Sequence, residues 1–152
     1  MSRDRLRTWA DPSSWTASLS ADGSPGQEQL SEFTGDPLAD ADQDGVIAII
    51  EYLGGLSDLV ASPEGLPMFE IINDAGSDYL AITFRRDPRA SGVAHFIEAS
   101  EDLESWSNSE ASELVTLVKT TTDGDGVPRH TYRLNVPMDG TSRQFIRLGV
   151  RY

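Results

Sequence analysis

The N-terminal half of the chain contains twelve residues whose side chains suit a metal ion. They read Asp40-Ala-Asp-Gln-Asp-Gly-Val-Ile-Ala-Ile-Ile-Glu51. Acidic residues occupy the first, third, fifth and twelfth places and a glycine the sixth, which is the pattern of the EF-hand calcium loop. Calcium takes about six to eight oxygen ligands, and carboxylates at alternate places of a tight loop can converge on one point. The spacing therefore predicts a calcium site.

The predicted ligand set combines side-chain and backbone oxygens. It comprises four carboxylates and one backbone carbonyl, those of Asp40, Asp42, Asp44, Glu51 and Val46. Gly45 is expected to take the positive φ that turns the chain around the ion. Ala48, in the ninth place, offers no side-chain oxygen, so a water molecule is expected there. The alternative is an acidic turn that binds no ion, in which the crowded carboxylates would repel one another.

Only the loop and a following helix fit the EF-hand pattern. A short helix is expected over residues 47–53, stopped by Gly54 and Gly55. Gly35 and Pro37 stand where an entering helix would lie. The run Asp123-Gly-Asp-Gly126 looks similar but has no acid in the twelfth place. Because a regulatory sensor normally pairs two loops, a single loop favours a structural ion.

The remainder of the chain predicts an antiparallel β-sandwich. From residue 67 onward, polar and apolar residues alternate between turn signals, with no helical pattern between them. The expected strands are 67–72, 78–86, 93–100, 112–121, 129–136 and 143–151. This is typical of a mainly β fold, a sandwich of immunoglobulin or fibronectin type, with a small barrel as the alternative.

Three segments are expected along the chain. Residues 1–35 form an irregular N-terminal segment, in which Trp9 and Trp15 could pack on the following domain. Residues 36–55 hold the calcium loop and short helix, and residues 66–152 hold the β-sandwich. The first seven residues are charged and lack the apolar stretch of a signal peptide. We therefore expect either an intracellular protein or a piece of a longer secreted chain, and the calcium loop favours the second.

Charge and composition limit the partners. The formal net charge is -13, and residues 8–84 contain fourteen acids but no Lys or Arg. Such a surface suits cations or a basic protein face, and it argues against nucleic acid and against a polybasic membrane contact. No apolar run approaches the length of about 18 residues needed to span a membrane. With no cysteine, the chain has no disulfide and no thiolate metal site.

No catalytic pattern stands out. His95 and His130 lack a partner at zinc-helix spacing, and no nucleophile elbow, P-loop or dinucleotide fingerprint occurs. The acids at 98, 101, 102 and 104 are expected to be solvated surface groups rather than a glycosidase pair. We therefore expect no enzymatic activity.

Trp106 and a cluster of arginines allow further expectations. Trp106 is expected to cover one end of the core; the alternative is that it stacks on a sugar ring. Arg85, Arg86 and Arg89 are expected to pair with acids at the surface.

The run from Asp36 to Gly55 resembles a calcium-loop segment near the C-terminus of many large secreted bacterial proteins. It is also similar to the loops of dockerins and thrombospondin type 3 repeats. The stretches 80–86, 96–106 and 143–150 resemble parts of the β domain that follows in those bacterial proteins. Ala48 and Ile49 depart from the usual Asn-Leu, and the absence of a second loop leaves only the loop in common with dockerins.

This resemblance implies an extracellular module attached to a larger protein. The expected function is a non-catalytic, calcium-stabilised unit for anchoring or protein contact. The alternative is a carbohydrate-binding module of a secreted polysaccharide-active protein, guided by an exposed tryptophan.

Overall fold

The computed structural model describes residues 32–111, 113–140 and 142–152. The elements in chain order are a helix α1 (Ala48–Gly54), a single 3-10 turn η3 (Pro63–Gly65), and strands β1 (Met68–Asp74), β2 (Ser77–Arg85), β3 (Ala94–Ser100), β4 (Ser107–Asn108), β5 (Val115–Thr122), β6 (Pro128–Leu134) and β7 (Phe145–Arg151). Trp9 and Trp15, and the irregular structure expected before residue 32, lie outside the described residues.

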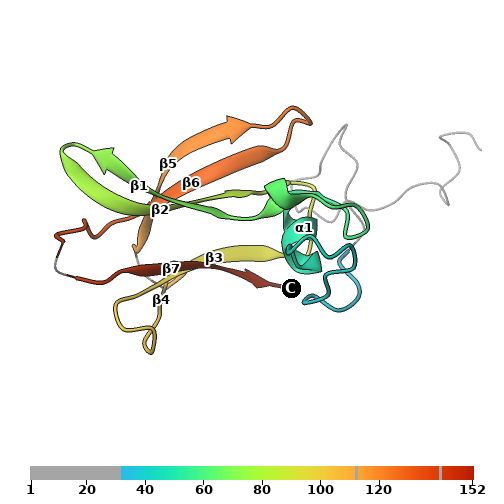
Figure 1. The fold of residues 1–152 in the computed structure, drawn as a ribbon, viewed down its shortest axis with the longest axis horizontal. Coiled ribbons are helices and arrows are strands. Elements are labelled where there is room, and N and C mark those ends of the chain that lie inside the picture. Colours follow the sequence, from blue (N-terminus) through green and yellow to red (C-terminus); the bar gives the residue numbers. More distant parts are fainter. Residues whose placement is uncertain (1–31, 112, 141) are drawn as a thin grey trace, which may run out of the picture.

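Two antiparallel sheets face each other, with α1 at one end (Figure 1). The first has the order β1-β2-β6-β5 and the second the order β4-β3-β7. The predicted mainly β, antiparallel sandwich is confirmed, and the described sheets do not close into a barrel. The order matches that of an immunoglobulin domain: β1, β2, β6 and β5 take the places of strands A, B, E and D, and β3 and β7 those of C and F.

The six expected strands occur within a few residues of their expected bounds. The seventh, β4, was not expected, because Ser107 and Asn108 fall within a stretch full of turn residues. Two residues cannot show the alternation by which a strand is recognised in a sequence. β4 is defined instead by its pairing with β3, where Asn108 lies opposite Glu98.

The core lies between the sheets and extends beneath the helix. Ile82 and Phe84 of β2 point inward together, as their alternation predicts, and pack with Ile97 of β3. The ring of Phe84 stacks on that of Tyr132, with centroids 5.8 Å apart. Each large apolar side chain buried in this way contributes about 1.5–3 kcal/mol.

Helix α1 closes one end of the sandwich and is fastened there at its C-terminus. Leu53 belongs to the core cluster, and its carbonyl accepts the amide of Asp87, 2.8 Å away. The Gly54 carbonyl accepts Nε of Arg85 at 3.1 Å. Gly55 ends the helix with φ 68°, and a Cβ there would collide with the Asp87 carboxylate. The loop that precedes α1 is therefore attached to a helix whose far end is fixed to the sandwich.

Candidate metal centre

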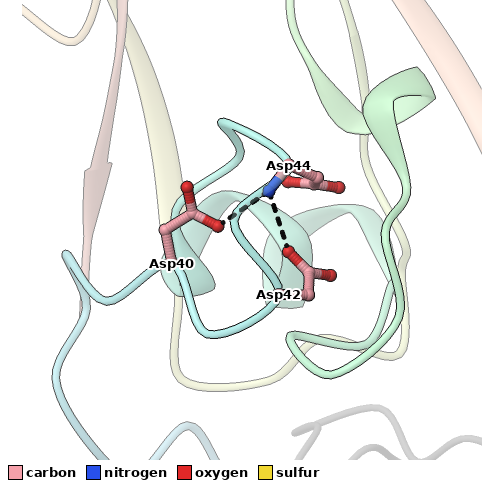
Figure 2. Close-up of side chains that lie close together, drawn as sticks. All are labelled: Asp40, Asp42 and Asp44. Carbon is pink, nitrogen blue, oxygen red and sulfur yellow. Dashed lines mark hydrogen bonds between the residues drawn. The ribbon is translucent and has the colours of Figure 1, made fainter.

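Three aspartates from the predicted loop lie together just before α1. One carboxylate oxygen from each of Asp40, Asp42 and Asp44 lies within 4.8 Å of the others, an arrangement that could hold a metal ion. Figure 2 shows the three side chains gathered around the backbone nitrogen of Asp44. The structure thus brings together the residues that the sequence places in the first, third and fifth places of the loop.

Hydrogen bonds inside the loop fix two of these carboxylates. Asp40 accepts the amides of Asp44 and Gly45, both at 3.1 Å, one on each oxygen. Asp42 accepts the Asp44 amide at 3.2 Å through one oxygen. The backbone turns at Gly45, with φ 91°, as predicted, and also at Gln43, with φ 62°. The loop is therefore organised around its carboxylates.

Asp44 also ties the loop to residues on either side of the helix. One oxygen of its carboxylate accepts the Val46 amide at 2.8 Å. The other accepts the backbone amide of Ser62, eighteen residues further along the chain. Ser62 carries no signal of this role in the sequence, because it contributes only its backbone. Asp44 therefore links the acidic loop to the segment between α1 and η3.

The two ends of the loop are joined by backbone hydrogen bonds. The amide of Ala48 donates to the Ala39 carbonyl at 2.8 Å, and that of Ile49 to the Pro37 carbonyl at 3.1 Å. These bonds satisfy two of the amides that a helix leaves unpaired at its start. They hold the chain before Asp40 against the first turn of α1.

Glu51, in the twelfth place of the loop, is fully buried within α1. Its exposed fraction is 0%, and neither carboxylate oxygen has a hydrogen-bond partner among the described residues. Burial, followed by the charges of Asp42, Asp44, Asp58 and Asp40, raises the pKa of Glu51 from 4.5 to about 7. Glu51 is not a member of the close group of three aspartates. It is nevertheless near enough for their charges to oppose its ionisation.

Asp42 has a similar orphan oxygen. Its second carboxylate oxygen, Oδ2, is buried and has no hydrogen-bond partner in the described chain. Burial and the neighbouring charges of Asp44 and Asp40 raise the pKa of Asp42. Buried carboxylate oxygens normally have partners, since an unmade bond to a charged group costs at least about 1–3 kcal/mol. These orphan oxygens, on Asp42 and Glu51, fit a site built for a cation.

The donor set suits a hard divalent cation. Carboxylate oxygens are the ligands that calcium and magnesium prefer, and the set contains no sulfur or imidazole. Bound there, such an ion would supply positive charge to four acids that otherwise repel one another. The Val46 carbonyl remains a predicted ligand; Val46 itself is buried directly after Gly45.

Arg85, the last residue of β2, does not form the surface pair that the sequence suggested, whereas the partly exposed Arg89 does pair with an acid, Asp87. Arg85 is only 4% exposed and pairs with Asp123 and Asp125 in the β5–β6 turn. Its guanidinium also reaches the end of α1, so the expectation of surface pairing is wrong for Arg85. The run Asp123-Gly-Asp-Gly126, which resembles a metal loop in sequence, is instead the acidic partner of a buried arginine.

Trp106 lies outside the core cluster, contrary to expectation. It is half-buried, and the Arg147 guanidinium carbon lies 3.8 Å from the centroid of its ring. Arg147 also donates to Glu98 at 2.6 Å. The acids at 101, 102 and 104 are exposed, as expected of solvated surface groups.

The two histidines lie in strands facing aromatic rings. His95 of β3 packs edge-on against Phe84, with centroids 5.0 Å apart. His130 of β6 hydrogen-bonds Thr120 at 3.1 Å. Burial lowers the pKa of both histidines, with a further contribution from the charge of Arg86. Neither belongs to the metal group found among the described residues.

Two further findings do not concern the candidate metal site. In the described ranges, no helix has the length and apolarity needed to cross a membrane. Comparison of the chain with protein-family models, with curated proteins and with solved structures gave no match.

Proposed function

We propose that the protein is a non-catalytic, extracellular module whose fold is stabilised by one calcium ion, and that it serves anchoring or protein contact. The proposed ligands are the carboxylates of Asp40, Asp42, Asp44 and Glu51, with the carbonyl of Val46. The observation that carries this proposal is Glu51, a fully buried carboxylate with no hydrogen-bond partner in the described chain and three aspartates nearby.

Alternative explanations of the acidic group account less well for Glu51. An acidic turn that binds no ion explains three half-buried aspartates that accept backbone amides, since aspartates form Asx turns without any ligand. It gives no reason to place a fourth carboxylate inside the adjacent helix, where ionisation is costly. A bound cation supplies that reason because it offsets the repulsion and completes the coordination of the buried oxygens.

A structural role for the cation follows from the way the loop is connected, through α1, to the core. The helix that carries Glu51 also carries Leu53 into the core, and its last carbonyls bind Asp87 and Arg85. A cation held by Glu51 and the loop would therefore stabilise the end of the sandwich. The stabilisation follows RT ln(1 + [L]/Kd), roughly 0.4–1.4 kcal/mol at about 1 mM calcium for a Kd of about 10⁻³ to 10⁻⁴ M.

The carbohydrate-binding alternative has less support in the described structure. Stacking of Trp106 on a sugar ring was the alternative to its covering the core, but the guanidinium of Arg147 lies over the face of its ring. A sugar approaching that face would have to displace a cation–π contact worth about 0.5–1 kcal/mol.

Thermal unfolding in calcium and in chelator tests the proposal. We expect a higher melting temperature in about 1 mM calcium, a concentration typical of extracellular sites, than in EGTA. The double variant Asp44→Asn/Glu51→Gln should melt at the same temperature in both. The variant Glu101→Gln, which removes an exposed acid far from the loop in sequence, is the matched control and should keep the calcium effect. Equal melting of the unaltered protein in both buffers would show that no ion stabilises it.

A further inference from the structure

The two sheets of the sandwich are unequal in width. The first has four strands and the second, among the described residues, has three. Within the described part of the chain, one strand of the first sheet therefore has no strand of the second sheet opposite it. The contacts between the sheets identify which strand this is.

The second sheet lies beneath β2 and β6. His95 of β3 packs against Phe84 of β2 and Tyr132 of β6, with ring centroids 5.0 and 6.0 Å apart. β7 contacts β2, whereas Ser107 of β4 lines a pocket with Leu134 of β6. The order of the second sheet beneath the first is therefore β7, β3, β4, and the space beside β7 lies under β1.

The side chains of β1 that point into this space are apolar and exposed. Phe69 lies opposite Ile82, and Ile71 opposite Leu80, so all four share the face that carries the core. Directly opposed residues of an antiparallel pair project to the same side of the sheet. Yet Phe69 is 56% and Ile71 60% exposed. A sandwich normally covers such an inward face with the second sheet.

The uncovered space corresponds to a definite position in the immunoglobulin order. With β3 and β7 in the places of strands C and F, the next position in the second sheet is that of strand G, beside F. The described residues place β3 on one edge of β7 and no strand on the other. An added strand there would pair with the free edge of β7, and its inward side chains would cover Phe69 and Ile71.

We propose that residues 15–19 of this chain, Trp-Thr-Ala-Ser-Leu, occupy this position as an eighth strand. Their apolar residues Trp15, Ala17 and Leu19 alternate with hydroxyl residues, which is the pattern of a strand with one buried face. A tryptophan and a leucine at alternate places match the two large side chains that β1 leaves open.

The chain enters the described structure near the C-terminal end of β7. The ring of Phe33 lies against that of Tyr152, with centroids 6.0 Å apart, just beyond the last residue of β7. The chain from Leu19 to Phe33 can span roughly 45 Å, whereas a seven-residue strand is roughly 23 Å long. Residues 15–19 can therefore reach the whole edge of β7 in either direction.

Hydrogen exchange on the full-length chain tests the proposal. The β7 amides that point away from β3 should be protected in the unaltered protein. Trp15→Asp/Leu19→Asp, which puts charges on the inward face, should make them exchange at least tenfold faster. The matched control Thr16→Asp/Ser18→Asp adds the same charge to the outward face and should leave exchange unchanged. Because the metal loop is untouched, the calcium effect on melting should persist in both variants, so this test and that of calcium stabilisation fail independently.

A second measurement covers the case in which the inward variant unfolds. In a Trp9→Phe/Trp106→Phe background, only Trp15 fluoresces, and acrylamide should quench it several-fold less efficiently than free tryptophan. Phe69→Ser/Ile71→Ser should remove that shielding. Fast exchange of the outward β7 amides in the unaltered protein, or equal quenching with and without Phe69 and Ile71, would overturn the proposal. Protection that disappears on dilution of a dimer would overturn it too, assigning the space to a second copy.

Discussion

Replacing Glu51 by Gln separates the electrostatic cost of burying this carboxylate from its proposed role as a calcium ligand. The pKa of this buried carboxyl is 4.5 in the unfolded chain and about 7 in the folded one. The folded state therefore holds the proton more tightly. Its contribution to stability is fully present below pH 4.5 and is lost as the pH rises through 7. In metal-free buffer this loss amounts to about 3 kcal/mol of unfolding free energy.

Glutamine has nearly the same shape and does not ionise, so the variant escapes this loss. The buried amide has its own desolvation cost, but that cost is the same at every pH and cancels when two pH values are compared. Between pH 5 and pH 8, in metal-free buffer, the stability of Glu51→Gln relative to the unaltered protein should rise by about 2–3 kcal/mol. Calcium at pH 8 should shift this difference back toward the unaltered protein, because the variant has lost a ligand.

Urea unfolding followed by circular dichroism measures these free energies. The control is Glu64→Gln, which neutralises an exposed acid of η3 and should show no such pH dependence. If the difference between Glu51→Gln and the unaltered protein is the same at pH 5 and pH 8, Glu51 does not titrate as the structure requires. If the variant retains the full calcium effect, Glu51 is not a ligand.

Three further substitutions probe the surroundings of the site. Asp44→Asn should weaken calcium binding at least tenfold. It should also speed hydrogen exchange at the Ser62 amide, because that amide donates to the Asp44 carboxylate; unchanged exchange at Ser62 would contradict this hydrogen bond between the loop and the segment after α1. Arg85→Met should lower the unfolding free energy by about 2–4 kcal/mol in urea, because it removes the guanidinium that pairs with Asp125, shares Asp123 with Arg129 and donates to the Gly54 carbonyl; a loss below about 0.5 kcal/mol would place Arg85 among surface pairs. Gly55→Ala should cost at least about 1 kcal/mol in thermal unfolding, because the residue has a positive φ and a Cβ would strike Asp87; Gly124→Ala, at a position with open space, is its control.

Local patterns made most of the fold predictable. Alternation located Ile82 and Phe84 on one face of a strand, and paired glycines located the end of α1, because each depends on residues close in sequence. β4 was missed because it is created by its neighbour β3. Arg85 was misplaced because its burial depends on a helix 31 residues earlier and a hairpin turn 38 residues later.

In the candidate metal site, too, features set by residues close in sequence were predictable and features set by distant residues were not. The spacing of Asp40, Asp42 and Asp44 was enough to predict their convergence, since all three belong to one tight loop. The role of Ser62 was not predictable, because a backbone amide leaves no mark on residue type. The exposure of Phe69 and Ile71 was not predictable either, since a strand pattern shows which face is apolar but not what covers it.

Equilibrium binding of calcium to the purified chain tests the central claim most directly. Dialysis against radioactive calcium should show one ion bound per chain, saturating at free concentrations of about 1 mM or below. Because Glu51 must release its proton, binding should be weaker at pH 6 than at pH 8. Absence of saturable binding at pH 8, or equal binding by Asp42→Asn/Glu51→Gln, would contradict a calcium site formed by this loop.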